Sequence, residues 1–205
     1  MTTLAGKVAL ITGAGKGSGR ALALAFAAHG ALVAANDISP VNVEEVVAEI
    51  NRQGGTAKAY IEDVAKKLGA QHLISQVEDD FGRLDILIHH AAVRPRVPLL
   101  DMDEWDWNRV LGVNLTGAFL MTQSAGRVMR ALSAQEGKGC GVIVHLVTTK
   151  QASAREEAAF GASMWGLAEF ARRAAQELSR YGIRVHAVET GKDAVEKVFA
   201  LLEEE

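Results

Sequence analysis

A glycine-rich segment follows the first apolar run of the chain and has the composition of a phosphate-binding turn. Its sequence is Thr-Gly-Ala-Gly-Lys-Gly-Ser-Gly over residues 12–19, and it opens into a helical pattern. Glycines let the backbone turn tightly and approach a pyrophosphate, while the next helix offers free N–H groups and the positive end of its dipole. The binding residues expected here are Gly13, Gly15, Lys16, Gly17, Ser18 and Gly19. A turn with a purely structural role is the alternative for such a pattern alone.

An acidic residue, Asp37, ends the next apolar run, where it can complete the site begun by the glycine turn. A carboxylate at this place accepts hydrogen bonds from the adenosine ribose hydroxyls and repels the 2′-phosphate of NADP. Lys16 acts in the opposite direction, because a cation in the turn could attract that phosphate. We therefore expect NAD as the cofactor and NADP as the less favoured ligand. The alternative for Asp37 is a solvated loop residue or a helix cap.

The elements that must position these residues alternate along the chain. Short runs rich in Val and Ile are separated by longer stretches of helical periodicity, which is typical of a parallel sheet covered on both faces. Strands are predicted over residues 8–12, 31–36, 56–61, 84–89, 142–147 and 183–188. Helices are predicted over residues 20–29, 41–53, 66–81, 102–132 (as two helices), 156–181 and 192–205. Glycines at positions 30, 54, 55, 82 and 182 stand where helices should end.

This alternation predicts an α/β fold with a single Rossmann-type, doubly wound parallel sheet of about six strands. Residues 1–205 are expected to form one dinucleotide-binding domain, since 205 residues suit one core and no repeat or linker divides them. No strand is predicted after residues 192–205, so the C-terminal region is expected to be truncated or shortened.

The composition narrows the classes of function. A net charge of −3 and a pI near 6.1 give no basic field for nucleic acid or an anionic membrane. The single cysteine, Cys140, cannot form an internal disulfide, and residues 1–7 lack the pattern of a signal peptide. No apolar stretch reaches the roughly 20 residues needed to span a bilayer. We expect a cytoplasmic protein with a small-molecule or protein partner.

Several motifs in order along the chain resemble the short-chain dehydrogenase/reductase family. Thr12, Gly13, Gly17 and Gly19 match its TGxxxGxG turn, Asp63-Val64 is similar to its adenine-contacting pair, and Asn114 lies in a segment resembling its central helix. The likeness extends through residues 142–144 and 182–185, which resemble its fifth and sixth strands. The resemblance implies a dinucleotide cofactor, with Ile38, Asp63, Val64, His90, Ala91 and Ala92 adding to the glycine turn and Asp37.

The same resemblance implies NAD(P)-dependent oxidoreduction of alcohols or carbonyls by a Ser-Tyr-Lys set assisted by an asparagine. In this chain Phe160 stands at the tyrosine position and Met164 at the lysine position. No Tyr-x-x-x-Lys occurs at all, because the only tyrosines, Tyr60 and Tyr181, are each followed four residues later by valine. The residual catalytic candidates are Asn114 and, at the serine position, Thr148 or its neighbour Thr149. The usual mechanism is expected to be lost.

Other departures also concern the nicotinamide end of the expected site. The family's Asn-Asn-Ala-Gly appears as His-His-Ala-Ala over residues 89–92, and its Pro-Gly as Thr190-Gly191. The substrate-covering segment that the family usually carries after this glycine is expected to be missing.

Three functions remain open from the sequence. The first is an NAD(H)-binding protein without the family's mechanism. The second is an oxidoreductase with a non-standard proton donor, for which the candidates are His89, His90, His145 and Lys150. The third is a non-catalytic scaffold or regulatory subunit. No metal site is expected, because His89 and His90 are adjacent on a strand and point to opposite faces.

Self-association is expected as well. The helices around residues 114–129 and 160–178 carry small and apolar residues on more than one side, which suits the helix-paired dimer that the resemblance implies. We expect a homo-oligomer, either a dimer or a tetramer. Trp105, Trp107 and Trp165 are candidates for that interface, with packing in the core as the alternative.

Overall fold

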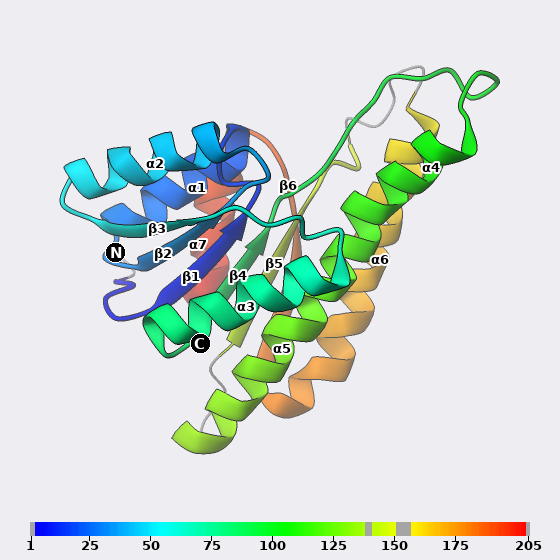
Figure 1. The fold of residues 1–205 in the computed structure, drawn as a ribbon. Coiled ribbons are helices and arrows are strands. Elements are labelled where there is room, and N and C mark those ends of the chain that lie inside the picture. Colours follow the sequence, from blue (N-terminus) through cyan, green and yellow to red (C-terminus); the bar gives the residue numbers. More distant parts are fainter. Residues whose placement is uncertain (1–2, 138–140, 151–156, 204–205) are drawn as a thin grey trace.

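A parallel sheet forms the centre of the molecule in the computed structural model, which describes residues 3–137, 141–150 and 157–203 (Figure 1). Within these ranges the six strands follow the order β3-β2-β1-β4-β5-β6. They are β1 (Val8–Thr12), β2 (Leu32–Asn36), β3 (Thr56–Tyr60), β4 (Ile86–His89), β5 (Gly141–Val147) and β6 (Ile183–Glu189). The chain order reverses between β1 and β4, as in a doubly wound Rossmann sheet. The predicted fold class is confirmed.

Helices cover both faces of the sheet (Figure 1). One layer contains α1 (Gly17–Ala28), α2 (Pro40–Arg52) and α7 (Ala194–Glu203), and the other contains α3 (Lys67–Phe81), α5 (Gly117–Glu136) and α6 (Ala158–Leu178). Ala9 and Ile11 of β1 pack toward the first layer, whereas Val8 and Leu10 pack toward the second. All five residues of β1 are buried, which explains the unbroken apolar run in the sequence.

A continuous helical rod precedes β5 and rises beyond the edge of the sheet (Figure 1). It consists of α4 (Glu104–Leu111), the π-helical turn η1 (Gly112–Thr116) and α5. The helix predicted from residue 102 begins at Glu104, because the carboxylate of Asp103 accepts a hydrogen bond from the backbone N–H of Asp106 at 2.7 Å. A glycine with φ of 69°, Gly137, ends it. The two predicted helices are therefore joined without a break.

The start of α1 differs from the sequence prediction by three residues. The helix begins at Gly17 instead of residue 20, so the last part of the glycine segment is helical. Gly17 has a φ of 55°, which a residue with a side chain rarely adopts, and this permits a helix to follow the turn at once. The 3-10 turn η2 (Ser179–Tyr181) extends α6 to the predicted end. The end of α5 lies at Glu136 instead of residue 132, and the other described boundaries agree to within two residues.

A buried carboxylate ties the first strand to the fourth. Asp85 accepts hydrogen bonds from the backbone N–H of Val8 at 2.9 Å and from two nitrogens of Arg83 at 2.8 and 2.6 Å, and Lys7 lies 3.2 Å away. Burial alone would raise the pKa of Asp85, but the bonds from Arg83 and Val8 hold it below its ordinary value. This carboxylate therefore stays ionised and aligns the amino ends of β1 and β4.

Two histidines lie side by side in the core at the other end of these strands. His89 of β4 pairs in register with His145 of β5, and their rings meet edge to face at 5.6 Å. His89 Nδ1 lies 3.1 Å from the hydroxyl of Thr12, and His145 Nε2 lies 3.0 Å from that of Thr122. Since the Thr122 hydroxyl donates to the carbonyl of Ala118, it accepts the proton of His145 Nε2. Nδ1 of His145 is buried and has no hydrogen-bond partner among the described residues, and burial lowers the pKa of the ring to about 4, so the ring is neutral near pH 7 with its proton on Nε2.

This histidine pair makes stability depend on pH. Burial lowers the pKa of His145 to about 4 and holds that of His89 well below its ordinary value. The unfolded chain then binds more protons than the folded protein below pH 6.5, so stability falls as the pH drops from 6.5 toward 4. His145 should remove about 2 kcal/mol from the free energy of unfolding between pH 6.5 and 5, and His89 should act in the same direction.

Urea unfolding at pH 7, 6 and 5 tests this expectation. The double variant His89→Asn with His145→Asn should have a flatter dependence on pH than the unmodified chain, whatever its absolute stability. His72→Asn is the control, because His72 is an exposed histidine on α3. Equal slopes in the double variant and the unmodified chain would contradict the assignment.

Candidate functional site

The glycine turn between β1 and α1 is packed so closely that larger residues do not fit. A Cβ atom on Gly13 would lie 2.9 Å from the backbone nitrogen of Ala91, and one on Gly19 would lie 2.2 Å from the carbonyl oxygen of Gly13. No side chain caps the N-terminus of α1 at Lys16, and its first turn carries no acidic residue. The N–H groups of this turn are thus left for another acceptor, which suits an anion.

The carboxylate of Asp37 is fixed against the glycine turn. Its Oδ2 accepts a hydrogen bond from the backbone N–H of Gly15, and its Oδ1 accepts one from that of Ser39, each at 2.9 Å. A Cβ atom on Gly15 would approach Asp37 Oδ2 to 2.8 Å and the Cβ of Asn42 to 2.6 Å. Gly15 therefore makes room for the Asp37 carboxylate and donates a hydrogen bond to it. The glycine pattern in the sequence predicted a place in the turn for Gly15 but not this contact with Asp37.

A cavity of about 230 Å³ opens at the carboxyl ends of β1, β2 and β4, beside this carboxylate. Ligands of open α/β sheets bind at this edge, where the strand order reverses. Its lining residues are Gly13, Lys16, Asn36, Asp37, Ile38, Glu62, Asp63, Val64, His90, Ala91, Ala92, Val93 and Val113.

Most of the binding residues predicted from the sequence meet at this cavity. Gly15, Gly17, Ser18 and Gly19 do not line it: they build the turn and the start of α1 beneath it. Asn36, Glu62, Val93 and Val113 line it and were missed. Each of the four adjoins a predicted site residue in the chain, so adjacency to a predicted site residue was the signal that could have found them.

His90 lies over the glycine turn. Its Nδ1 is 3.1 Å from the carbonyl oxygen of Gly13, and since a carbonyl only accepts, this nitrogen carries a proton. Burial lowers the pKa of His90, so the ring is neutral near pH 7. The backbone N–H groups of His90 and Ala91 both donate to the hydroxyl of Thr12, at 3.2 and 3.3 Å. The segment after β4 is thereby held against the end of β1.

Asn114, a residual catalytic candidate, is fully buried in the π-helical turn η1. Its Oδ1 accepts from the backbone N–H of Val93 at 2.8 Å, and its Nδ2 donates to the carbonyl of Val93 at 3.0 Å and to the hydroxyl of Ser163 at 2.9 Å. Ser163 in turn donates to the carbonyl of Phe160. The amide thus joins the segment after β4 to α6, and both of its donor hydrogens are used within the protein.

The two positions at which the resemblance implies tyrosine and lysine lie inside an apolar cluster. Phe160 and Met164, one turn apart on α6, are 5% and 2% exposed. They pack with Ala118, Val147 and Leu167. Neither side chain carries a group that could exchange a proton with a substrate near neutral pH.

An ion-paired arginine lies over this cluster. The guanidinium of Arg94 is 4.8 Å from the centre of the Phe160 ring and donates two hydrogen bonds to Glu157, at 2.8 and 2.7 Å. Arg96 lies 3.5 Å from the same carboxylate. Arg94 and Arg96 hold the pKa of Glu157 below its ordinary value, so this buried acid remains charged. This ion-paired group was not among the predicted site residues.

The other proposed proton donors are dispersed. The hydroxyl of Thr148 bonds to that of Thr190 at 2.7 Å, and Thr149 bonds to Glu189 through its hydroxyl and its backbone N–H. Lys150 is exposed. His89 and His145 are core residues, so the suggestion that they act as proton donors at the site is wrong, because neither ring reaches the cavity described above.

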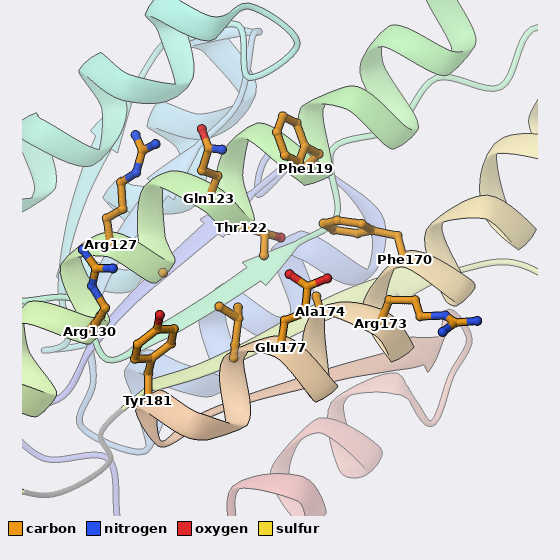
Figure 2. A pocket seen from close by; sticks show the side chains of 12 residues that line it. Phe119, Thr122, Gln123, Arg127, Arg130, Phe170, Arg173, Ala174, Glu177 and Tyr181 are labelled. Carbon is orange, nitrogen blue, oxygen red and sulfur yellow. The ribbon is translucent and has the colours of Figure 1, made fainter.

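A second hollow lies between α5 and α6, away from the first cavity (Figure 2). Figure 2 shows the aromatic rings of Phe119 and Phe170 at one end and Tyr181 at the other, with arginines along the α5 side.

Trp105 and Trp165 are 66% and 63% exposed. Packing of these tryptophans in the core, the alternative considered from the sequence, is therefore wrong.

Two structural absences hold for the described part of the chain. No helix there combines the length and the apolar character needed to cross a bilayer. The same residues contain no group of three or more histidine, cysteine or acidic side chains placed to hold a metal ion. Between β6 and α7, residues 190–193 form only a short turn, closed by a hydrogen bond from Ala194 to Gly191.

Comparison with known proteins agrees with this geometry. A family model described as short chain dehydrogenase matches residues 7–197. The chain is 35% identical over 186 residues to the D-threitol dehydrogenase of Mycolicibacterium smegmatis, a match that covers 90% of this chain and 69% of the relative.

Two similar solved structures carry a cofactor in their descriptions. An NAD⁺-bound xylitol dehydrogenase superposes with a TM-score of 0.84 and 30% identity, covering 92% of this chain and 71% of its own. A metagenomic short-chain oxidoreductase in complex with NADP has a TM-score of 0.88 and 29% identity, covering 98% and 92%. With a family match that spans most of its length and relatives that superpose over most of it, this chain belongs to the short-chain dehydrogenase family.

Proposed function

We propose that this chain is a single-domain, cytoplasmic protein that binds NAD(H) and lacks the usual oxidoreductase mechanism of its family. The proposal rests on a contrast between two parts of the site along the carboxyl edge of the sheet. At one end Asp37 is held against a glycine turn beside an open cavity. At the other end Phe160 and Met164 are buried where the mechanism would need a tyrosine and a lysine.

The residues present fit the adenosine and pyrophosphate portion of a dinucleotide. The N–H groups at the start of α1 would hold the pyrophosphate, and Asp37 would accept hydrogen bonds from the adenosine ribose. Asp63 and Ile38, which line the same cavity, would border the adenine. Asp37 would repel a 2′-phosphate more strongly than Lys16 would attract it, because its carboxylate is fixed by two hydrogen bonds while Lys16 is exposed.

When bound, the nicotinamide group supplies hydride transfer, which in this family is coupled to a proton moved by the protein. Here Phe160 and Met164 move no proton, and Asn114 already uses its donor hydrogens within the fold. Thr148 has a hydroxyl, bonded to Thr190, but no neighbouring cation to lower its pKa among its described contacts. We therefore expect this chain to bind NAD(H) without efficient turnover of a substrate.

Two other functions remain as rivals. An oxidoreductase with a non-standard donor would have to use His90, the only one of the proposed histidines that lines the cavity. A non-catalytic scaffold or regulatory subunit would use the exposed apolar residues of α4, α5 and α6 to contact a partner. The first rival requires turnover and the second requires a different protein in the complex, so each is open to direct measurement.

Self-association through α5 and α6 is the second part of the proposal. The hollow between these helices contains apolar and aromatic residues on a surface that a second copy would cover (Figure 2). Phe119 of α5 is 42% exposed although it stacks edge to face with Phe170 of α6. Aromatic residues are enriched in the buried parts of homodimer interfaces.

Asp37→Asn tests the cofactor assignment. Removing the charge while keeping the shape should weaken NAD⁺ about tenfold, since hydrogen bonds to a charged group contribute about 1.5–3 kcal/mol. It should also reduce the preference for NAD⁺ over NADP⁺, because the repulsion of the 2′-phosphate is lost. Titration calorimetry with both cofactors measures this, with Asp79→Asn on α3 as an exposed acidic control. Tighter binding of NADP⁺ than NAD⁺ by the unmodified chain would refute the assignment.

Restoring the missing pair tests the catalytic part. The unmodified chain should reduce no member of a panel of carbonyl compounds above background, since a positioned proton donor contributes about 10²–10⁴ in rate. Phe160→Tyr with Met164→Lys should produce only partial activity, because residues 190–193 leave no segment to cover a substrate. NADH consumption at 340 nm is the readout, and Phe160→Tyr alone is the control. Turnover by the unmodified chain that His90→Asn abolishes would instead support the non-standard enzyme.

Phe119→Glu tests self-association. A charge placed in the α5/α6 hollow should convert a dimer to a monomer, because burying it unpaired is costly. Light scattering after size-exclusion chromatography gives the mass, and Leu68→Glu on α3, an exposed apolar residue elsewhere, should leave it unchanged. A monomeric unmodified chain would rule out the dimer.

A further inference from the structure

The walls of the cavity stop before the part of the site where the rest of a dinucleotide would lie. All of its described lining residues lie between Gly13 and Val113 of the sequence, and none belongs to β5, α6 or β6. Its volume of about 230 Å³ is below the roughly 300–1,000 Å³ of pockets that enclose a complete drug-sized ligand. The preformed cavity therefore has room for only a portion of NAD.

We infer that this site recognises the ADP portion of its ligand alone, so that ADP and ADP-ribose are ligands equivalent to NAD(H). The inference rests on the proposed function, since it assigns the chemical class of ligand that the same cavity selects. It changes the expected physiological ligand from an oxidised or reduced dinucleotide to any compound that carries an adenosine diphosphate group.

The groups that can select a ligand are concentrated at the ADP end. The N–H groups of the first turn of α1 and the cation of Lys16 suit two linked phosphates. Asp37 is fixed by Gly15 and Ser39 with its carboxylate beside the cavity, where it suits the hydroxyls of an adenosine ribose. Each of these features is common to ADP, ADP-ribose, NAD⁺ and NADH.

At the opposite end, the described polar groups beside Phe160 and Met164 are already bonded within the fold. Asn114 uses its oxygen and both donor hydrogens on Val93 and Ser163, and Arg94 uses two nitrogens on Glu157. The cation that the family places on α6 is replaced by Met164, which is 2% exposed. A second ribose or a nicotinamide ring would find an apolar cluster covered by an ion pair there.

This distribution predicts how affinity depends on the ligand. Contacts to a shared portion stabilise every ligand that contains it by the same amount, so they create no preference among those ligands. Oxidised and reduced cofactor should also bind alike, because they differ only in the ring that the site does not hold. The protein would then report the amount of adenosine diphosphate compounds without reporting their redox state.

Titration calorimetry with ADP, ADP-ribose, NAD⁺ and NADH on the full chain tests the inference. The four dissociation constants should agree to within about threefold, a difference of well under one power of ten. AMP, which lacks the second phosphate, should bind more weakly than all four, and nicotinamide mononucleotide should show no binding. Asp37→Asn should weaken the four ligands by the same factor.

Saturation-transfer NMR on the NAD⁺ complex gives an independent readout that requires no variant. Saturation should reach the adenine protons strongly and the nicotinamide protons weakly.

The variant Met164→Lys restores a cation on α6 near the place of the second ribose. Where this variant folds, it should bind NAD⁺ and ADP-ribose, which carry the second ribose, more tightly relative to ADP.

The outcomes separate this inference from the proposed function. NAD⁺ binding at least about tenfold more tightly than ADP, or equal saturation of adenine and nicotinamide protons, overturns the inference and leaves NAD binding intact. Binding of ADP without binding of NAD⁺ overturns the dinucleotide proposal and also the equivalence of the four ligands, because a site for their shared portion must accept both. Absence of binding by all four ligands overturns both.

Discussion

The hydroxyl of Thr12 lies where the two halves of the sheet meet, and the arrangement of the site depends on it. Thr12 ends β1, the strand beside which the chain order reverses, and it is fully buried. Its single oxygen receives the backbone N–H groups of His90 and Ala91 and contacts the ring of His89. Because these contacts close the gap between β1 and β4, Gly13 is pressed against Ala91 and only glycine fits there. The position of the cavity follows from this contact.

The polar groups along the carboxyl edge of the sheet differ on the two sides of Thr12. Toward β2 the polar groups are offered to the cavity, with Asp37 oriented by backbone donors and the start of α1 left uncapped. Toward β5 and α6 the polar groups are joined to one another, as in the bonds between Asn114 and Ser163. A polar group that is fully bonded within the fold has little to gain from a ligand, because binding would only exchange one partner for another. The end beside Asp37 can therefore bind a polar ligand, whereas the end beside Asn114 and Ser163 offers a ligand few free polar groups.

The rod formed by α4, η1 and α5 connects these two regions. Its π-helical turn inserts Asn114 toward the segment after β4, and a π turn of this kind is often found at functional sites. In this chain the turn bonds to Ser163 of α6, while Phe160 and Met164 of the same helix lie in an apolar cluster. The same rod presents Phe119 on its outer side beside α6. One helix thus contributes both to the internal joint and to the surface proposed for self-association.

The sequence by itself determined the sheet, its helices and the glycine turn, since these depend on local patterns. Apolar runs, helical periodicity and glycines at helix ends act over a few neighbouring residues, and their order along the chain permitted few arrangements. The acid at the end of β2 was also predictable, because a strand end is a defined place in such a sheet. The absence of a Tyr-x-x-x-Lys pair is likewise read from the sequence alone, since no register of this chain supplies it.

Only the tertiary structure decided which side chains meet. Arg94 and Glu157 are 63 positions apart, and Asn114 and Ser163 are 49 apart, so no local pattern links them. Whether His145 lay in the core or at the site, and whether Trp165 was buried, depended on which face of an element was covered by its neighbour. Burial is set by the packing of helices that are distant in sequence, and that packing decided where the open site ends and the closed core begins.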